Sequence, residues 1–248
     1  MDVTNPEAPP KLLAEITHED LGFTTSMPTI MKSRTQDGNG GFTEGGDGWY
    51  LVFGSGPAGN DENGRREALN LAKSEKTAKV FVFDLDAREE VELVAELEEN
   101  SFTGGFTSED WDRNYQDDAF YFGVIGPEDT ENGGFAGSLR RGAPSRPGSD
   151  NFNVDYLLDD SVNLPFSAAP LTYRDILGEY WVFAGTGRFF VPEDNLTVQQ
   201  NYFYGIKELR AHSDPTESVP LEDEDNSCLL YTSPSPRDLS TSRMPSSA

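Results

Sequence analysis

Cysteine is nearly missing from this chain: its single cysteine is Cys228, close to the end of the 248 residues. One thiol cannot form an internal disulfide framework, and residues 1–227 contain no thiol for nucleophilic or redox chemistry. The scarcity of cysteine therefore excludes a disulfide-stapled scaffold and a thiol-dependent enzyme, and it leaves the cellular compartment open.

The last 21 residues, 228–248, lack glycine and any hydrophobic periodicity, and they read CLLYTSPSPRDLSTSRMPSSA. Back-translation of Cys228–Asp238 gives a transposase-type sequencing adaptor, and Ser242–Ala248 resembles the flow-cell end of such a library. We expect this stretch to be a non-native, adaptor-derived tail and exclude it from the fold. The natural reading frame is then interrupted near Ser227 and continues in a longer protein. The alternative is a natural tail rich in serine and proline.

Basic residues are also scarce, with 19 lysines and arginines against 44 aspartates and glutamates. The net charge is −25, and it becomes −26 without the tail, which holds two arginines and one aspartate. Such a surface repels nucleic acid and anionic membranes and is suited to binding cations. The chain has no apolar run of the roughly 18–20 residues that cross a bilayer.

Sets of residues typical of enzymes are missing as well. The two histidines, His18 and His212, lie in acidic surroundings near the two ends, and we expect both to be surface residues. The sequence offers no Ser/His/Asp or Cys/His set, no P-loop and no dinucleotide-binding glycine pattern. The glycine-rich Gly185–Phe190 is followed by no helical pattern, so it predicts a tight turn between strands. These absences favour a protein that is not an enzyme.

Glycine, proline and aromatic residues are abundant, and this composition favours many short strands. We expect residues 88–100 to form a strand rather than a helix, residues 68–73 to form a short helix, and residues 37–48 to form a loop. Runs of β-branched and aromatic residues predict the clearest strands: Trp49–Phe53, Val80–Phe83, Ala119–Phe122, Tyr180–Phe183 and Tyr202–Ile206.

One strand pattern occurs three times, as an aromatic run closed by two nearby glycines: Trp49–Gly56, Phe120–Gly126 and Tyr180–Gly187. Aligning the copies places Phe53, Phe122 and Phe183 at equivalent positions. Each copy is followed by a second expected strand, at residues 79–85, 137–140 and 201–208. A repeated strand unit with loops of uneven length is typical of propeller blades. The sequence therefore predicts an all-β fold, a partial and truncated β-propeller.

The sharpest chemical feature is the acidic loop Asp110–Asp118. Oxygen-bearing side chains at its positions 1, 3 and 5 (Asp110, Asp112 and Asn114) converge on one point in a tight loop. The backbone carbonyl of Gln116 and the carboxylate of Asp118 can add a fourth and a fifth oxygen. Ca²⁺ prefers six to eight such oxygen ligands. The loop therefore predicts a calcium site, and the alternative is an acidic turn on an acidic surface.

This loop departs from an EF-hand, because position 6 is Tyr115 instead of glycine and position 12 is Tyr121 instead of glutamate. With fewer ligands we expect weak affinity, on the order of 10⁻⁴–10⁻³ M or somewhat tighter. We expect Asp117 to point away from the ion. A second acidic cluster, Asn60–Gly64, lacks the alternating spacing, and we interpret it as a solvated loop.

Together these features resemble the PilC/PilY family of proteins associated with type IV pilus tips. The resemblance covers roughly residues 10–209 and rests on motifs that occur in the family's order: Leu51–Pro57, Ala78–Asp86, Ser101–Gly105, Asp110–Asp118, Gly137–Arg140, Pro165–Pro170, Val182–Phe190 and Tyr202–Glu208. The chain departs from the family in its acidity, in an insertion at residues 57–77, and in lacking the N-terminal adhesin-like region and the closing blades.

The resemblance implies a C-terminal β-propeller related to quinoprotein folds, with Ca²⁺ as cofactor. It gives ligand roles to Asp110, Asp112, Asn114 and Asp118 and the carbonyl role to Gln116. It also implies roles in pilus assembly, control of retraction and surface attachment. The implied partners are minor pilins at the pilus tip and a host or abiotic surface, and the implied location is extracellular, reached through a signal peptide outside this sequence.

We accordingly expect a disordered lead at residues 1–10, a propeller fragment at 11–210, an acidic disordered segment at 211–227 and the adaptor-derived tail at 228–248. Two other functions stay open. One is a quinoprotein dehydrogenase-like enzyme, and the other is a calcium-dependent adhesive propeller unconnected with pili.

Overall fold

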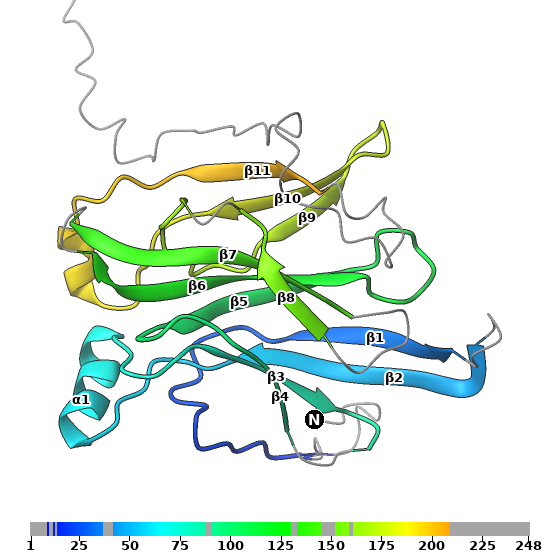
Figure 1. The fold of residues 1–248 in the computed structure, drawn as a ribbon, viewed down its shortest axis with the longest axis horizontal. Helices are drawn as coiled ribbons and strands as arrows, with labels where there is room; N and C mark the ends of the chain where they lie inside the picture. Colours follow the sequence, from blue (N-terminus) through cyan, green and yellow to red (C-terminus); the bar gives the residue numbers. More distant parts are fainter. Residues whose placement is uncertain are drawn as a thin grey trace, which may run out of the picture.

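The computed structural model describes residues 9, 12, 14–36, 42–87, 91–129, 133–144, 152–158 and 161–208. Its strands form three antiparallel sheets that follow one another along the chain (Figure 1). Sheet 1 contains β1 (Thr29–Gln36), β2 (Phe42–Gly54), β3 (Lys79–Asp84) and β4 (Glu92–Glu96). Sheet 2 contains β5 (Phe102–Glu109), β6 (Ala119–Asp129), β7 (Gly134–Pro144) and β8 (Phe152–Tyr156). Sheet 3 contains β9 (Leu171–Arg174), β10 (Tyr180–Gly185) and β11 (Phe203–Lys207).

Each sheet is an up-and-down meander in which consecutive strands are hydrogen-bonded neighbours. Figure 1 shows the sheets stacked face to face, with sheet 2 between the other two. Blade-like antiparallel sheets in sequence order, without closure into a barrel, form the partial β-propeller that the sequence predicts. The three copies of the aromatic pattern lie in β2, β6 and β10, the second strand of each sheet, and the expected second strands are β3, β7 and β11.

The predicted alignment of these copies is wrong by one residue in sheet 3. Phe122 of sheet 2 packs toward sheet 1, and Phe53 of sheet 1 lies on the face of β2 that points away from sheet 2. In both sheets this phenylalanine therefore points away from the sheet that follows in the chain. Phe183 instead lies on the face of β10 that points away from sheet 2, while its neighbour Val182 packs against sheet 2. Because side chains alternate between the faces of a strand, a shift of one residue reverses the face.

The core lies on both faces of sheet 2, and β6 explains why. Its Phe120, Phe122 and Val124 pack against sheet 1, whereas Ala119 and Tyr121 pack against sheet 3. A strand with two buried faces needs apolar side chains at every position, and this accounts for its unbroken apolar run. Burying one such phenylalanine contributes about 1.5–3 kcal/mol to stability, so the two faces of β6 hold the three sheets together.

The outer face of sheet 1 is covered by the chain that precedes β1. Ile16 and Leu21 pack against Phe53 and Phe81 there, and the His18 ring lies 4.8 Å from the Phe81 ring. The expectation that His18 is a surface residue is therefore wrong in part, because it is half-buried and accepts a hydrogen bond from the Asp20 N–H (3.1 Å). His212 lies outside the described residues.

Two segments, one outside the sheets and one within β2, differ from expectation. The helix α1 (Glu62–Leu71) begins earlier than the predicted helix at residues 68–73. Asp61 caps it by accepting a hydrogen bond from the Gly64 N–H (2.8 Å), so the second acidic cluster is a helix start and its interpretation as a solvated loop is wrong. Residues 42–48, expected in a loop, extend β2, while 37–41 lie outside the described residues. The strand expected within 88–100 is confirmed as β4, with 88–90 also outside the described residues.

The predicted tight turn at Gly185–Phe190 is also wrong. These residues open the long connection from β10 to β11, which contains the 3-10 helix η1 (Pro192–Leu196). Arg188 of this connection donates hydrogen bonds to the carbonyl oxygens of Leu71 and Ala72, at the end of α1. The glycine-rich motif therefore attaches the end of sheet 3 to the helix of sheet 1.

The segments predicted at the two ends of the chain lie almost wholly outside the described residues, so their boundaries stay predictions. Residues 1–10, apart from residue 9, and the segments 211–227 and 228–248 lie outside the described residues. Among the helices that the structure does describe, none is long and apolar enough to cross a membrane.

Candidate metal centre

The predicted calcium loop connects β5 to β6 in sheet 2. The two strands are paired up to Glu109 and Ala119, so residues 110–118 leave the sheet and return to it at adjacent positions. The Asp118 N–H also donates to the Glu109 carbonyl oxygen (2.9 Å), which closes the base of the loop. Pairing of the flanking strands therefore brings the first and last residues of the loop together.

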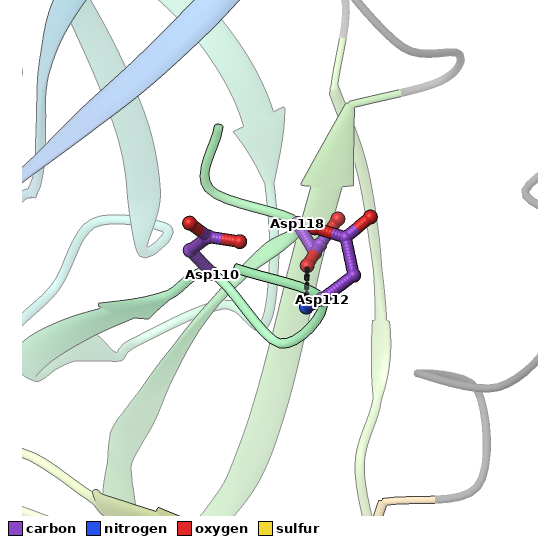
Figure 2. Close-up of side chains that lie close together, drawn as sticks. All are labelled: Asp110, Asp112 and Asp118. Atoms are coloured by element: carbon purple, nitrogen blue, oxygen red, sulfur yellow. Dashed lines mark hydrogen bonds between the residues drawn. The ribbon is translucent and has the colours of Figure 1, made fainter. Parts of the chain in front are cut away.

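The structure brings together three of the predicted ligands. One carboxylate oxygen from each of Asp110, Asp112 and Asp118 lies within 4.8 Å of the others. Figure 2 shows the side chains of Asp112 and Asp118 side by side, with the carboxylate of Asp110 facing them across the loop. Asp110 and Asp118 are half-buried and Asp112 is exposed, so an ion could enter from the Asp112 side.

Hydrogen bonds within the loop hold its backbone around these carboxylates. The two oxygens of Asp110 accept from the N–H groups of Asn114 (3.1 Å) and Tyr115 (2.8 Å). Arg113 and Tyr115 have φ values of 62° and 70°, in the left-handed region. These two turns direct successive N–H groups inward, so the loop is preorganised around its acidic side chains.

The two remaining predicted ligands, Asn114 and Gln116, are not part of the cluster of three carboxylates. Asn114 lies beside the three carboxylates, and its amide nitrogen donates to Asp112 (2.8 Å) while its amide oxygen accepts from the Gln116 N–H (2.8 Å). That oxygen has a second lone pair, so it can keep its backbone hydrogen bond and still serve as a ligand, and its ligand role stays a prediction. Gln116 is buried, and the ligand role of its carbonyl stays a prediction.

The electrostatics of the loop favour a cation. Burial, followed by the charge of Asp112, raises the pKa of Asp118 to about 6. Asp118 nevertheless accepts hydrogen bonds from the N–H groups of Trp111 (2.7 Å) and Asp112 (3.3 Å), which stabilise its charged form. The pKa of Asp118 thus stays raised despite these two donors, because burial and, after it, the neighbouring carboxylates disfavour its charge, and a bound cation would relieve both effects.

Asp117 points away from the three carboxylates, as expected. Its carboxylate accepts a hydrogen bond from the Lys32 N–H (2.6 Å), and its own N–H donates to the Lys32 carbonyl oxygen (2.9 Å). Burial raises the pKa of Asp117, while the Lys32 hydrogen bond opposes that change. Asp117 therefore attaches the loop to β1 of sheet 1.

A buried polar chain below the loop was not predicted from the sequence. The Trp111 indole N–H donates to the Tyr121 hydroxyl (2.8 Å), which donates to the Glu208 carboxylate (2.9 Å). Arg141 pairs with the same carboxylate (3.1 Å). Burial and then the charge of Glu208 raise the pKa of Tyr121 well above its usual value, so the hydroxyl stays protonated and can donate. The one available sequence signal was a tryptophan inside an otherwise polar loop.

Comparison with known proteins finds a similar fold among solved structures. No family model matches the sequence, and no curated protein matches it. Among solved structures, the crystal structure of the Pseudomonas aeruginosa PilY1 C-terminal domain matches with a TM-score of 0.56 at 20% sequence identity. The match covers 88% of this chain and 44% of that domain, so the chain spans less than half the length of the structure it matches. Over this length the chain has the fold of the PilY1 C-terminal domain, and its three sheets form a partial β-propeller. At the level of the fold, this match confirms the resemblance to the PilC/PilY family.

Proposed function

We propose that this chain is a calcium-binding part of the β-propeller of a type IV pilus assembly and tip adhesin protein. The observation that carries the proposal is the convergence of the Asp110, Asp112 and Asp118 carboxylates in the β5–β6 loop. The shared fold with the PilY1 C-terminal domain supports the connection with pili. The role is structural and adhesive and involves no catalysis, and its site of action is the cell surface.

The chemistry of the ligands favours Ca²⁺ over softer cations. The donors are carboxylate oxygens and an amide oxygen, and hard divalent cations bind such groups. A short loop with one exposed carboxylate leaves room for water to complete the six to eight ligands of Ca²⁺. Mg²⁺ requires near-ideal octahedral geometry and releases its water reluctantly, so we expect it to bind more weakly.

The bound ion acts on the pilus through the shape of the propeller. Ca²⁺ offsets two of the three negative charges of Asp110, Asp112 and Asp118 and fixes the β5–β6 loop, and with it the edge of sheet 2 from which the loop projects. In this proposal that edge contributes to the surface that meets minor pilins. Calcium then controls assembly and retraction of the pilus, and attachment to a host or abiotic surface, by stabilising a binding conformation.

Isothermal titration calorimetry of the purified chain with Ca²⁺ tests the metal site. We expect one site with a Kd on the order of 10⁻⁴–10⁻³ M or somewhat tighter, weaker binding of Mg²⁺, and loss of binding in the Asp110→Ala plus Asp112→Ala variant. The matched control is Glu67→Ala plus Glu99→Ala, which removes the same charge from exposed positions away from the loop. Equal Ca²⁺ binding by the two double variants would refute the site.

The pilus role needs a separate test. Pull-down of purified minor pilins by the chain, with Ca²⁺ and with EDTA, is expected to show calcium-dependent capture. Capture by the Asp110→Ala plus Asp112→Ala variant is expected to be lost, whereas the Glu67→Ala plus Glu99→Ala variant retains it. Calcium binding without any pilin capture favours a calcium-dependent adhesive propeller that is unconnected with pili.

A further inference from the structure

The β5–β6 loop contacts all three sheets. Its flanking residues belong to sheet 2, where Glu109 ends β5 and Ala119 begins β6. On one side, Asp117 exchanges two backbone-directed hydrogen bonds with Lys32 of sheet 1, at 2.6 and 2.9 Å. On the other side, Glu109 accepts a hydrogen bond from the Thr172 hydroxyl of sheet 3 (2.6 Å). The loop and the strand residue at its base therefore contact both neighbouring sheets.

Trp111, the second residue of the loop, makes the deepest of these contacts. Its side chain is 2% exposed, and its ring lies 4.8 Å from the ring of Tyr180 in sheet 3. The polar chain from Trp111 through Tyr121 then crosses the interface to Glu208, which directly follows β11 and is 2% exposed. Arg141 of sheet 2 reaches the same carboxylate. A buried carboxylate next to sheet 3 thus contacts Tyr121 and Arg141 of sheet 2, and through Tyr121 it is linked to Trp111 of the loop.

The predicted metal ligands and these contacts share the same backbone. Asp118 accepts a hydrogen bond from the Trp111 N–H, so a carboxylate of the candidate site directly holds the residue that reaches sheet 3. Asp117, the neighbour of Asp118, is the residue that reaches sheet 1. A cation that draws Asp110, Asp112 and Asp118 together therefore fixes residues 111 and 117 at the same time.

We propose that cation binding in the β5–β6 loop clamps sheets 1 and 3 onto sheet 2, so that the ion controls the packing between blades. This inference rests on the proposed calcium site and extends it from a local loop to two interfaces. Thermodynamic reciprocity gives it a second consequence. If Ca²⁺ strengthens the contacts made through Trp111, then weakening those contacts must weaken Ca²⁺ binding, although no ligand is changed.

Hydrogen–deuterium exchange of the unaltered chain, with Ca²⁺ and with EDTA, tests the first consequence. The reporters are the amide of Lys32, bonded to Asp117, and the amide of Glu208, bonded to the Tyr180 carbonyl oxygen. The reference is the amide of Val124, in the middle of sheet 2. We expect Ca²⁺ to slow exchange at both reporters by about five- to tenfold, with a smaller change at Val124.

Tyr121→Phe tests the second consequence, because it removes only the hydroxyl that links Trp111 to Glu208. We expect the Ca²⁺ Kd, measured by calorimetry, to rise about fivefold or more, and the calcium-dependent protection at Glu208 to disappear. The matched control is Tyr204→Phe, which removes a hydroxyl from the same buried cluster without touching the polar chain. The control is expected to retain both the affinity and the protection.

The outcomes separate this inference from the function on which it rests. Calcium binding with protection confined to residues 110–118, or an unchanged Kd in Tyr121→Phe, overturns the clamp and leaves the calcium site standing. Absence of calcium binding by the unaltered chain overturns both. The exchange experiment uses no variant, so the inference stays testable even where Tyr121→Phe fails to fold.

Discussion

Among the described residues, Arg188 links segments that lie 116 and 117 positions apart in the sequence. Its guanidinium donates to Leu71 and Ala72 at the end of α1 (2.6 and 2.9 Å) and pairs with Asp194 in η1 (3.0 Å). Both charged side chains are 3% exposed, and the Phe135 ring lies 3.9 Å from the guanidinium carbon. The Leu71 and Ala72 carbonyl groups at the end of α1 therefore find their partner in the β10–β11 connection, as helix ends require.

Arg188→Met is expected to lower the free energy of unfolding by about 3–5 kcal/mol, because it leaves a buried carboxylate and two helix carbonyl groups without their partner. Urea denaturation measures the loss. The control is Arg66→Met, which removes an exposed pair with Glu62 and is expected to cost less than about 0.5 kcal/mol. Similar losses in the two variants would contradict the role assigned to Arg188.

Local spacing explains which site residues the sequence could predict. Asp110, Asp112 and Asp118 are brought together by a loop of nine residues, so their convergence follows from the sequence of that loop alone. The Tyr121–Glu208 contact joins residues 87 positions apart and depends on how sheet 3 packs on sheet 2. No local pattern contains that information, and the polar chain below the loop was therefore missed.

Among the elements, the strands buried on both faces were the easiest to predict. In β6 an aromatic run ends in glycine, and Gly123 is required because a Cβ there would lie 1.9 Å from the Phe166 carbonyl oxygen. In β10 the same pattern occurs, but the residues that face sheet 2 are shifted by one position. Both Val182 and Phe183 are apolar, so the sequence did not show which of them faces sheet 2. Only packing against a neighbouring sheet decides the phase of such a strand.

The segment before β1 is the element that the sequence described least, and one ion-pair cluster holds it. The Asp20 carboxylate lies 2.8 Å from the ammonium nitrogens of both Lys76 and Lys79. These two hydrogen-bonded lysines lower the pKa of Asp20 to about 2. The cluster holds Leu21 and Ile16 against the outer face of sheet 1, which covers an otherwise exposed aromatic surface.

Asp20→Asn is expected to cost about 1 kcal/mol at neutral pH, since partial exposure to water reduces the value of the pairs. The folded-state pKa lies below the unfolded value, so this contribution is fully present above about pH 4 and is lost as the pH falls toward about 2. Urea denaturation of the two proteins across this pH range measures the difference. A stability gap that stays constant down to about pH 2 would rule out the ion pairs as its cause.

For the molecule as a whole, the two outer faces of the stack differ. The outer face of sheet 1 is covered by residues 16–21, whereas the far face of sheet 3 carries Trp181, Phe183 and Phe203 in a stack, with ring centroids 6.3 and 6.1 Å apart. Phe203 is 46% exposed there. The composition and the repeated strand pattern predicted an all-β chain with blade-like repeats, and they contained no signal for this asymmetry, because both faces are rich in aromatic residues.

The net charge of −25 affects the whole molecule, and salt tests its effect. Raising NaCl from about 0.01 M to about 0.15 M shortens the Debye length from about 30 Å to about 8 Å. Because self-repulsion destabilises a compact state of high net charge, we expect the melting temperature to rise with NaCl. CaCl₂ at equal ionic strength is expected to raise it further, because binding to the folded state adds to screening.

The Asp110→Ala plus Asp112→Ala variant separates these two contributions. It retains most of the net charge, so its melting temperature is expected to follow NaCl as the unaltered chain does, whereas the additional rise in CaCl₂ disappears. Differential scanning calorimetry measures both responses. A melting temperature that falls as NaCl rises would mean that attractive surface pairs such as Lys73–Glu128 outweigh the repulsion, and the stability of this acidic fold would then depend on local pairing rather than on its total charge.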